Sequence, residues 1–246
     1  MCRLVLMNKE GEKEIENTYG LSKYFKYLEN QLGGHGNGYS LMKNGKVIDY
    51  NKGINLDVRD IAKKMQNTDY DWAIFHTRWA SVGSKSDKNC HPFRREDTVL
   101  AMNGTEPSVS FIADTTEMTD TESILDLIYK YHLGLSTLRR FRSIFIGFSN
   151  KKPFIVANNT INIKLLKNEE TKALVFASSF PYAFKKNIFE AKEGFSWIGG
   201  KLPNVFTKYV RRYYKPITFE DYGIYENEFE QLYLDAERRG GYVAWI

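Results

Sequence analysis

Short apolar segments of strand length recur along this chain in two groups, with helical patterns before, between and after them. The predicted strands are residues 4–7, 39–42, 46–50, 72–75, 99–102, 143–148, 153–157, 161–166 and 173–178. Helical spacing of apolar residues marks 21–32, 58–65, a segment that begins near residue 119, and 229–236. This order favours an α+β fold with layered sheets and helices over a doubly wound parallel sheet.

Composition favours a folded chain with a large core. Hydrophobic residues make up 42% and aromatic residues 15% of the 246 positions, which argues against disorder. No composition shift divides the chain, so we expect one domain over residues 1–246, with a less regular region from about residue 185.

The charge pattern is mild and gives little indication of a charged partner. A net charge of +5 arises from 35 basic and 30 acidic residues spread along the chain, so we expect no nucleic-acid partner. The basic aromatic segment 209–215 is more typical of a packed element than of a nucleic-acid surface. We find no apolar run of signal-peptide or membrane-spanning length, and only two cysteines, so we expect a cytoplasmic protein without a disulfide framework or metal site.

A glycine-rich turn at residues 33–38 raises the question of a nucleotide site. Gly34, Gly36 and Gly38 are spaced G-x-G-x-G and precede a predicted strand, whereas a dinucleotide site needs G-x-G-x-x-G at the start of a helix. We therefore expect no cofactor. The turn is either a structural loop or a lid over a substrate.

Cys2 is a candidate nucleophile. Its small side chain permits removal of Met1, which would place a thiol and an α-amine on the same residue ahead of a buried strand. A thiol titrates near ~8.5 and an α-amine near ~7.7 to 8.0, so the amine could accept the thiol proton. Considered alone, the cysteine is more typical of a buried strand position.

Five short motifs occur in an order that resembles class II glutamine amidotransferases, which are N-terminal-nucleophile hydrolases. They are MCR at residues 1–3, HTRWASVG at 76–83, NCHP at 89–92, NG at 103–104 and DTE at 120–122. The resemblance extends to about residue 180 and implies a four-layer αββα sandwich. It also implies hydrolysis of the glutamine side-chain amide, with Cys2 at the end of a central strand, facing the loops after Phe75 and Met102.

The resemblance also implies a role for each further site residue. Asn103 and the Gly104 N–H would form the oxyanion hole, although Asn-Gly alone is more typical of a hairpin turn. Arg78 would bind the substrate carboxylate through its planar donor edge, where the alternative is a surface ion pair. Asp120 would bind the substrate ammonium, where the alternative is a helix cap.

Four other motif residues have smaller expected roles. Trp79 and Ser81 would line the glutamine pocket, while His76 and His91 would orient loops through hydrogen bonds. Two positions depart from the family pattern, because Met102 and Val82 occupy places where the family usually has histidine.

Hydrolysis of the glutamine side-chain amide would release ammonia, and we recognise no residues in this sequence that could transfer it to an acceptor. We therefore expect a separate synthetase or acceptor subunit as partner. The alternatives are a stand-alone hydrolase of γ-glutamyl amides and, less favoured, a catalytically inactive binding subunit.

Overall fold

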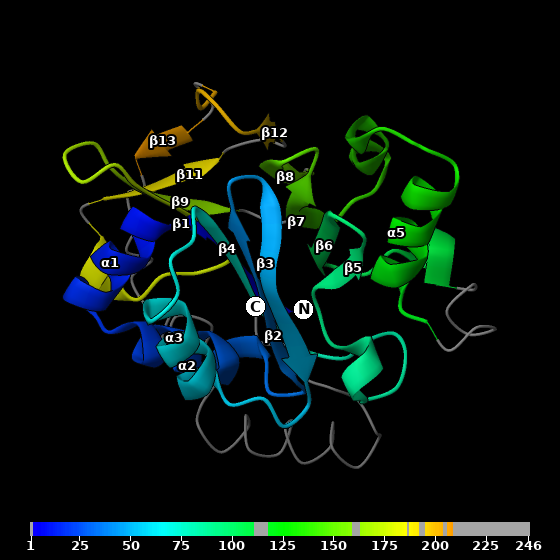
Figure 1. Cartoon of the computed structure of the whole chain (residues 1–246), viewed down its shortest axis with the longest axis horizontal. Coiled ribbons are helices and arrows are strands. Elements are labelled where there is room, and N and C mark those ends of the chain that lie inside the picture. Colours follow the sequence, from blue (N-terminus) through cyan, green and yellow to red (C-terminus); the bar gives the residue numbers. More distant parts are fainter. Residues whose placement is uncertain are drawn as a thin grey trace, which may run out of the picture. The chain divides into compact units, whose positions relative to one another are not determined.

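Two antiparallel sheets form the centre of the computed structural model (Figure 1), which describes residues 2–110, 118–158, 163–185, 187–191, 195–203 and 206–208. These residues belong to one unit, residues 1–209, and a second unit comprises residues 210–246. The predicted helix at 229–236 and the basic aromatic segment 209–215 lie outside the described residues. The expectation of a single domain therefore stays a prediction.

The larger sheet has, among the described residues, eight strands in the order β13-β11-β9-β10-β1-β4-β2-β3. In chain order these strands are β1 (Arg3–Asn8), β2 (Asn37–Lys43), β3 (Lys46–Gly53), β4 (Trp72–Thr77), β9 (Lys164–Asn168), β10 (Ala173–Ala177), β11 (Ile188–Ala191) and β13 (Phe206–Lys208). β1 lies inside the sheet, because Val5 pairs with Phe75 of β4 and with Ala177 of β10. Residue 2 therefore precedes a central strand, as predicted.

The smaller sheet has, in the described part of the chain, five strands in the order β12-β8-β7-β6-β5. These are β5 (Phe93–Arg95), β6 (Thr98–Asn103), β7 (Ile144–Ser149), β8 (Lys152–Ala157) and β12 (Phe195–Ile198). The helices are α1 (Lys9–Thr18), α2 (Leu21–Leu32), α3 (Val58–Gln66) and α5 (Asp120–Lys130), with short 3₁₀ segments at Asp87–Asn89, Leu135–Arg140 and Tyr182–Phe184.

Three apolar clusters join four layers. Side chains alternate along β1, so Val5 faces the core beneath α1, α2 and α3, while Leu4 faces the core between the two sheets. On the other side of the smaller sheet, Phe145 packs with Ile124 of α5. Figure 1 shows α1, α2 and α3 beside one sheet and α5 beside the other. The order helix, sheet, sheet, helix confirms the predicted αββα sandwich.

Local sequence signals account for most of these elements. Asn44 and Gly45 both have positive φ, 50° and 74°, which fits the two-residue hairpin predicted between β2 and β3. Thr119 is the N-cap of α5 and its hydroxyl accepts the Glu122 N–H at 3.1 Å, as the capping signal predicts.

The sequence interpretation omitted α1 and the strands after residue 187. α1 is rich in charged residues, and its local signal is the Asn8 side chain, which caps the helix by accepting the Gly11 N–H at 2.9 Å. The region expected to be less regular forms β11, β12 and β13, each only three or four residues long. Strands this short give weak alternation patterns.

None of the helices in the described residues is both long enough and apolar enough to cross a membrane.

Candidate active site

Cys2 lies immediately before β1, beside the loop that follows β4. β1 and β4 are antiparallel with Arg3 opposite Thr77, so the start of one strand lies next to the end of the other. The Trp79 N–H donates to Cys2 Sγ at 3.3 Å, and Sγ lies 3.5 Å from the Trp79 carbonyl oxygen. The side chain is 6% exposed, and this burial raises the pKa of the thiol, while the bond from Trp79 lowers it.

One small pocket contains six of the seven residues that the sequence assigns to the site. Its lining includes Cys2, Arg78, Trp79, Ser81, Gly104 and Asp120, together with Val82, His91, Met102, Thr119 and Thr121. The pocket encloses about 10 Å³, room for about one water molecule, so its walls must move to admit an amino acid. Five separate segments of the chain therefore meet at the start of β1.

Asn103 ends β6 and is linked to the nucleophile's strand through a hydroxyl. Its Nδ2 donates to Ser178 Oγ at 3.2 Å, and the same oxygen accepts the Leu4 N–H at 3.1 Å. Asn103 Oδ1 has no hydrogen-bond partner within the described residues. β6 pairs with β7, which begins only at Ile144, so Asn103-Gly104 is not the two-residue hairpin turn considered as its alternative.

Gly104 occupies a conformation and a space that exclude other residues. Its φ is +146°, and a Cβ at this position would lie 2.1 Å from Ser143 Oγ. Ser143 cannot easily move aside, because its N–H and hydroxyl both donate to Glu106 Oε1. The backbone N–H that follows Asn103 therefore depends on glycine for its position.

Arg78 is buried, with 2% of its surface exposed, and is not the surface ion pair considered as its alternative. Its Nη1 donates to the Ser84 carbonyl oxygen at 2.7 Å, and its Nη2 donates to the Val82 carbonyl oxygen at 2.7 Å. The guanidinium thus holds its own loop closed in this structure.

Asp120 lies at the start of α5 and also lines the pocket. Its Oδ2 accepts the Glu106 N–H at 2.9 Å, and its Oδ1 accepts the Thr121 N–H at 2.9 Å. Burial raises the pKa of this carboxyl group, and the two backbone bonds oppose that change. The carboxylate therefore orders the loop after Gly104 as well as the first turn of the helix.

His76 and His91 each make one side-chain hydrogen bond, but that of His76 joins two strands, β4 and β6, and does not orient a loop as predicted. His76 Nε2 donates to the Met102 carbonyl oxygen at 3.1 Å, and His91 Nε2 lies 2.7 Å from Thr121 Oγ1. The rings are 4.3 Å apart, and Nδ1 of each has no partner among the described residues. Burial lowers the pKa of His76 to about 3 and that of His91 well below its usual value, so both are neutral.

Among the supporting residues to which the sequence interpretation gave no role are His35 and Ser178. His35 belongs to the glycine turn, which was interpreted only as a loop or lid, and its Nδ1 accepts the Ala80 N–H at 3.0 Å. Ser178 follows β10, whose apolar residues predicted a strand but gave no sign that a hydroxyl would reach Asn103. Neither contact is readable from spacing, because both join segments brought together only by strand pairing.

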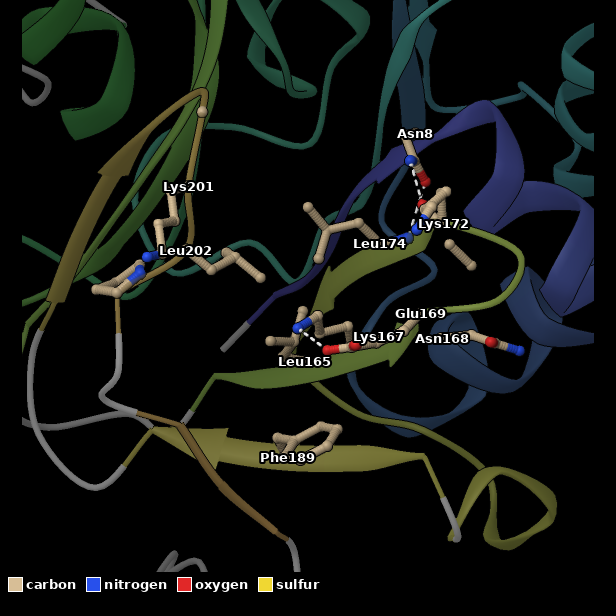
Figure 2. Close-up of a pocket in the computed structure, with 13 residues that line it drawn as sticks. Asn8, Leu165, Lys167, Asn168, Glu169, Lys172, Leu174, Phe189, Lys201 and Leu202 are labelled. Carbon is tan, nitrogen blue, oxygen red and sulfur yellow. Dashed lines mark hydrogen bonds and ion pairs between the residues drawn. The ribbon is translucent and has the colours of Figure 1, made fainter.

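A second cavity, of about 590 Å³, lies at the opposite end of β1, where Asn8 contributes to its wall (Figure 2). Its wall combines side chains of β9, β10 and β11 with Lys201 and Leu202 from the segment after β12. The ionisable side chains there are Lys167, Glu169, Lys172 and Lys201. This lining includes no thiol, so this cavity is not where we expect the chemistry predicted for Cys2.

Comparison with known proteins identifies the fold. The chain is 30% identical, over an alignment of 131 positions that covers 44% of this chain, to the glutamine–fructose-6-phosphate aminotransferase (isomerizing) of Aquifex aeolicus strain VF5. It spans only 21% of that relative. No family model matches the chain.

Two solved structures are similar over most of the chain. One is the glutamine phosphoribosylpyrophosphate amidotransferase of B. subtilis complexed with ADP and GMP, with TM-score 0.54, 16% identity and coverage of 80% of this chain and 49% of that one. The other is an allosteric regulatory enzyme of purine biosynthesis, with TM-score 0.54 and 17% identity. The match covers 83% of this chain and 50% of that one. The chain thus spans about half the length of these proteins and shares the fold of the part that it covers, which in the first of them belongs to a glutamine amidotransferase.

Proposed function

We propose that this chain hydrolyses the side-chain amide of glutamine with Cys2 as the nucleophile and delivers the ammonia to an acceptor enzyme. The observation that carries the proposal is the single pocket at the start of β1, which is lined by Cys2, Arg78, Gly104 and Asp120. Such a set combines a nucleophile, an oxyanion donor and two charges suited to an amino-acid zwitterion.

Removal of Met1 would give Cys2 a free α-amine. The amine takes the thiol proton, and the sulfur attacks the amide carbon of glutamine, giving a tetrahedral intermediate. The Asn103 side-chain amide and the Gly104 N–H stabilise its oxyanion. The departing nitrogen takes the proton from the ammonium group and leaves as ammonia. Water then hydrolyses the γ-glutamyl thioester to glutamate and free thiol.

Substrate binding requires Arg78 to exchange partners. We expect the α-carboxylate of glutamine to replace the carbonyl oxygens of Val82 and Ser84, which now lie 2.7 Å from the guanidinium. Opening of this loop would also widen a pocket that holds about one water molecule in the present form. Asp120 would bind the α-ammonium, while Trp79 and Ser81 would line the widened pocket.

The acceptor is proposed to lie outside these 246 residues. The name of the Aquifex relative describes an aminotransferase, and this chain matches only 21% of it, which supports a glutaminase that works with another domain or subunit. A stand-alone hydrolase of a larger γ-glutamyl amide remains the alternative.

Two measurements test the nucleophile. Intact-mass spectrometry of the purified chain should show loss of Met1, and Cys2→Ala should abolish glutamine hydrolysis. Cys90→Ser is the matched control, because Cys90 is a buried free thiol that does not line the pocket, and its turnover should stay within about a few-fold. Retained Met1, or undiminished activity of Cys2→Ala, contradicts the proposal.

A substrate panel separates the two functions. Glutamine and larger γ-glutamyl amides are compared as substrates, with and without the product of a neighbouring synthetase gene. Strong turnover of a larger amide, with little activity on glutamine and no response to the synthetase, would favour the stand-alone hydrolase.

A further inference from the structure

His35 connects the glycine turn to the loop beside the nucleophile. Its backbone N–H donates to the Arg78 carbonyl oxygen at 2.9 Å, and the Arg78 N–H donates to the Gly36 carbonyl oxygen at 2.8 Å. The ring adds a third bond, because Nδ1 accepts the Ala80 N–H at 3.0 Å. A backbone N–H can only donate, so Nδ1 must be unprotonated.

These bonds hold the peptide groups on both sides of Trp79. The imidazole ring also stacks on the Trp79 indole, with ring centroids 4.5 Å apart and planes inclined at 23°. The Trp79 backbone in turn contacts Cys2 Sγ through its N–H at 3.3 Å and its carbonyl oxygen at 3.5 Å. A single residue therefore separates His35 from the nucleophilic sulfur.

We infer that His35 is a positioning residue for Cys2. Its neutral imidazole fixes the Trp79–Ala80 peptide, and this holds the Trp79 backbone in the conformation in which the preceding Arg78–Trp79 peptide donates its N–H to the thiol. This inference rests on the proposed function only in its kinetic consequence. The bond from Trp79 lowers the pKa of the thiol, so losing the correct orientation of that peptide makes the thiolate harder to form.

Protonation of His35 removes the acceptor and places an N–H against the Ala80 N–H. The charged groups facing the ring are Lys85 and Arg78, both cationic, and Cys90 Sγ lies 4.0 Å from the His35 carbonyl oxygen. Burial, followed by the charges of Lys85 and Arg78, lowers the pKa of His35 below its usual value. The ring is therefore neutral at neutral pH, and the arrangement is lost only in acid.

Two variants isolate the hydrogen bond. His35→Phe keeps a ring to stack on Trp79 but has no acceptor, whereas His35→Asn places an amide oxygen where Nδ1 accepts. The first readout is the pH dependence of Cys2 alkylation by iodoacetamide, followed on the Cys2 peptide by mass spectrometry. We expect the midpoint of the alkylation profile of His35→Phe to lie about 0.5 to 1 pH unit above that of wild type. The midpoint of His35→Asn should return to the wild-type value.

The second readout is glutamine hydrolysis. We expect kcat to fall about five- to tenfold in His35→Phe with little change in KM, because His35 does not line the pocket. As the pH falls, titration of the α-amine should lower log kcat/KM with a slope of about one in wild type and in His35→Asn. Protonation of His35 should lower kcat/KM of wild type by about a further five- to tenfold, a loss that His35→Asn should not show.

The matched control is His132→Asn, since His132 is exposed at the end of α5 and its φ of 51° suits asparagine. Coincident alkylation profiles for wild type and His35→Phe would overturn the inference, as would a His35→Asn variant as impaired as His35→Phe or an equal shift in His132→Asn. A shifted profile in a chain that does not hydrolyse glutamine would support the positioning role and reject the proposed function.

Discussion

Replacing Gly104 with alanine tests the proposed oxyanion hole most directly. The added Cβ would lie 2.1 Å from Ser143 Oγ and 2.6 Å from Ser143 Cβ, and the φ of +146° is strained for any residue with a Cβ. Such strain typically costs about 1 to 3 kcal/mol. Because Glu106 fixes Ser143, we expect residue 104 to move and take its N–H away from the reacting carbonyl.

The expected effect has two measurable parts. Loss of one oxyanion donor costs about 2.7 to 4 kcal/mol of transition-state stabilisation, so kcat for glutamine should fall about 100- to 1000-fold. The free energy of unfolding, from urea titration, should fall by about 1 to 3 kcal/mol, which leaves most of the protein folded at 25 °C.

Gly134→Ala is the matched control. Its φ is −71°, and a Cβ there would come no closer than 3.6 Å to Ser136 Oγ, so the same substitution is tolerated locally. Wild-type turnover in Gly104→Ala would refute the assignment of its N–H to the oxyanion hole. Equal losses in both variants would show that the effect is not specific to the site.

Three further predictions follow from contacts of the site. Ser178→Ala removes the hydroxyl that Asn103 Nδ2 contacts, and steady-state kinetics should show kcat about tenfold lower with KM little changed; a change in KM alone would contradict this. Arg78→Lys cannot reproduce the planar donor edge and should lower kcat/KM for glutamine about ten- to a hundredfold, mostly through KM; wild-type kinetics would place the carboxylate elsewhere. His76 has a pKa of about 3 when folded against 6.5 when unfolded, so its unfolded form binds more protons between these values. Stability should therefore be full above pH 6.5 and fall towards pH 3, and His76→Gln, which keeps a donor for the Met102 carbonyl oxygen, should flatten the urea-measured profile.

Much of the fold could be predicted because its signals are local. The hairpin at Asn44-Gly45 depends on two residues that accept positive φ, and the start of α5 depends on the Thr119 side chain. α1 was missed because Ile15 is its only large apolar residue that is buried, so the helix is stabilised by packing of its sheet-facing side against β10 and not by a strong local pattern.

The candidate site was predicted as a set of residue types, and the pocket contains six of those seven residues. The sequence could not give their partners in this structure. Arg78 donates to loop carbonyl oxygens, and Asp120 accepts backbone N–H groups from both Glu106 and Thr121. These contacts depend on loop conformations, which spacing does not specify.

The sequence by itself determined the layered α+β architecture, the buried strand that follows Cys2 and the residue types expected at the candidate site. These could be predicted because periodicity, turn residues and motif order are properties of the chain. Only the tertiary structure decided which other side chains contact and position those site residues. Antiparallel pairing of β1 with β4 and β10 brings Trp79 and Ser178 to the start of β1, and the glycine turn brings His35 to Ala80. Such contacts join residues up to 174 positions apart, as between Leu4 and Ser178, and no local pattern encodes them.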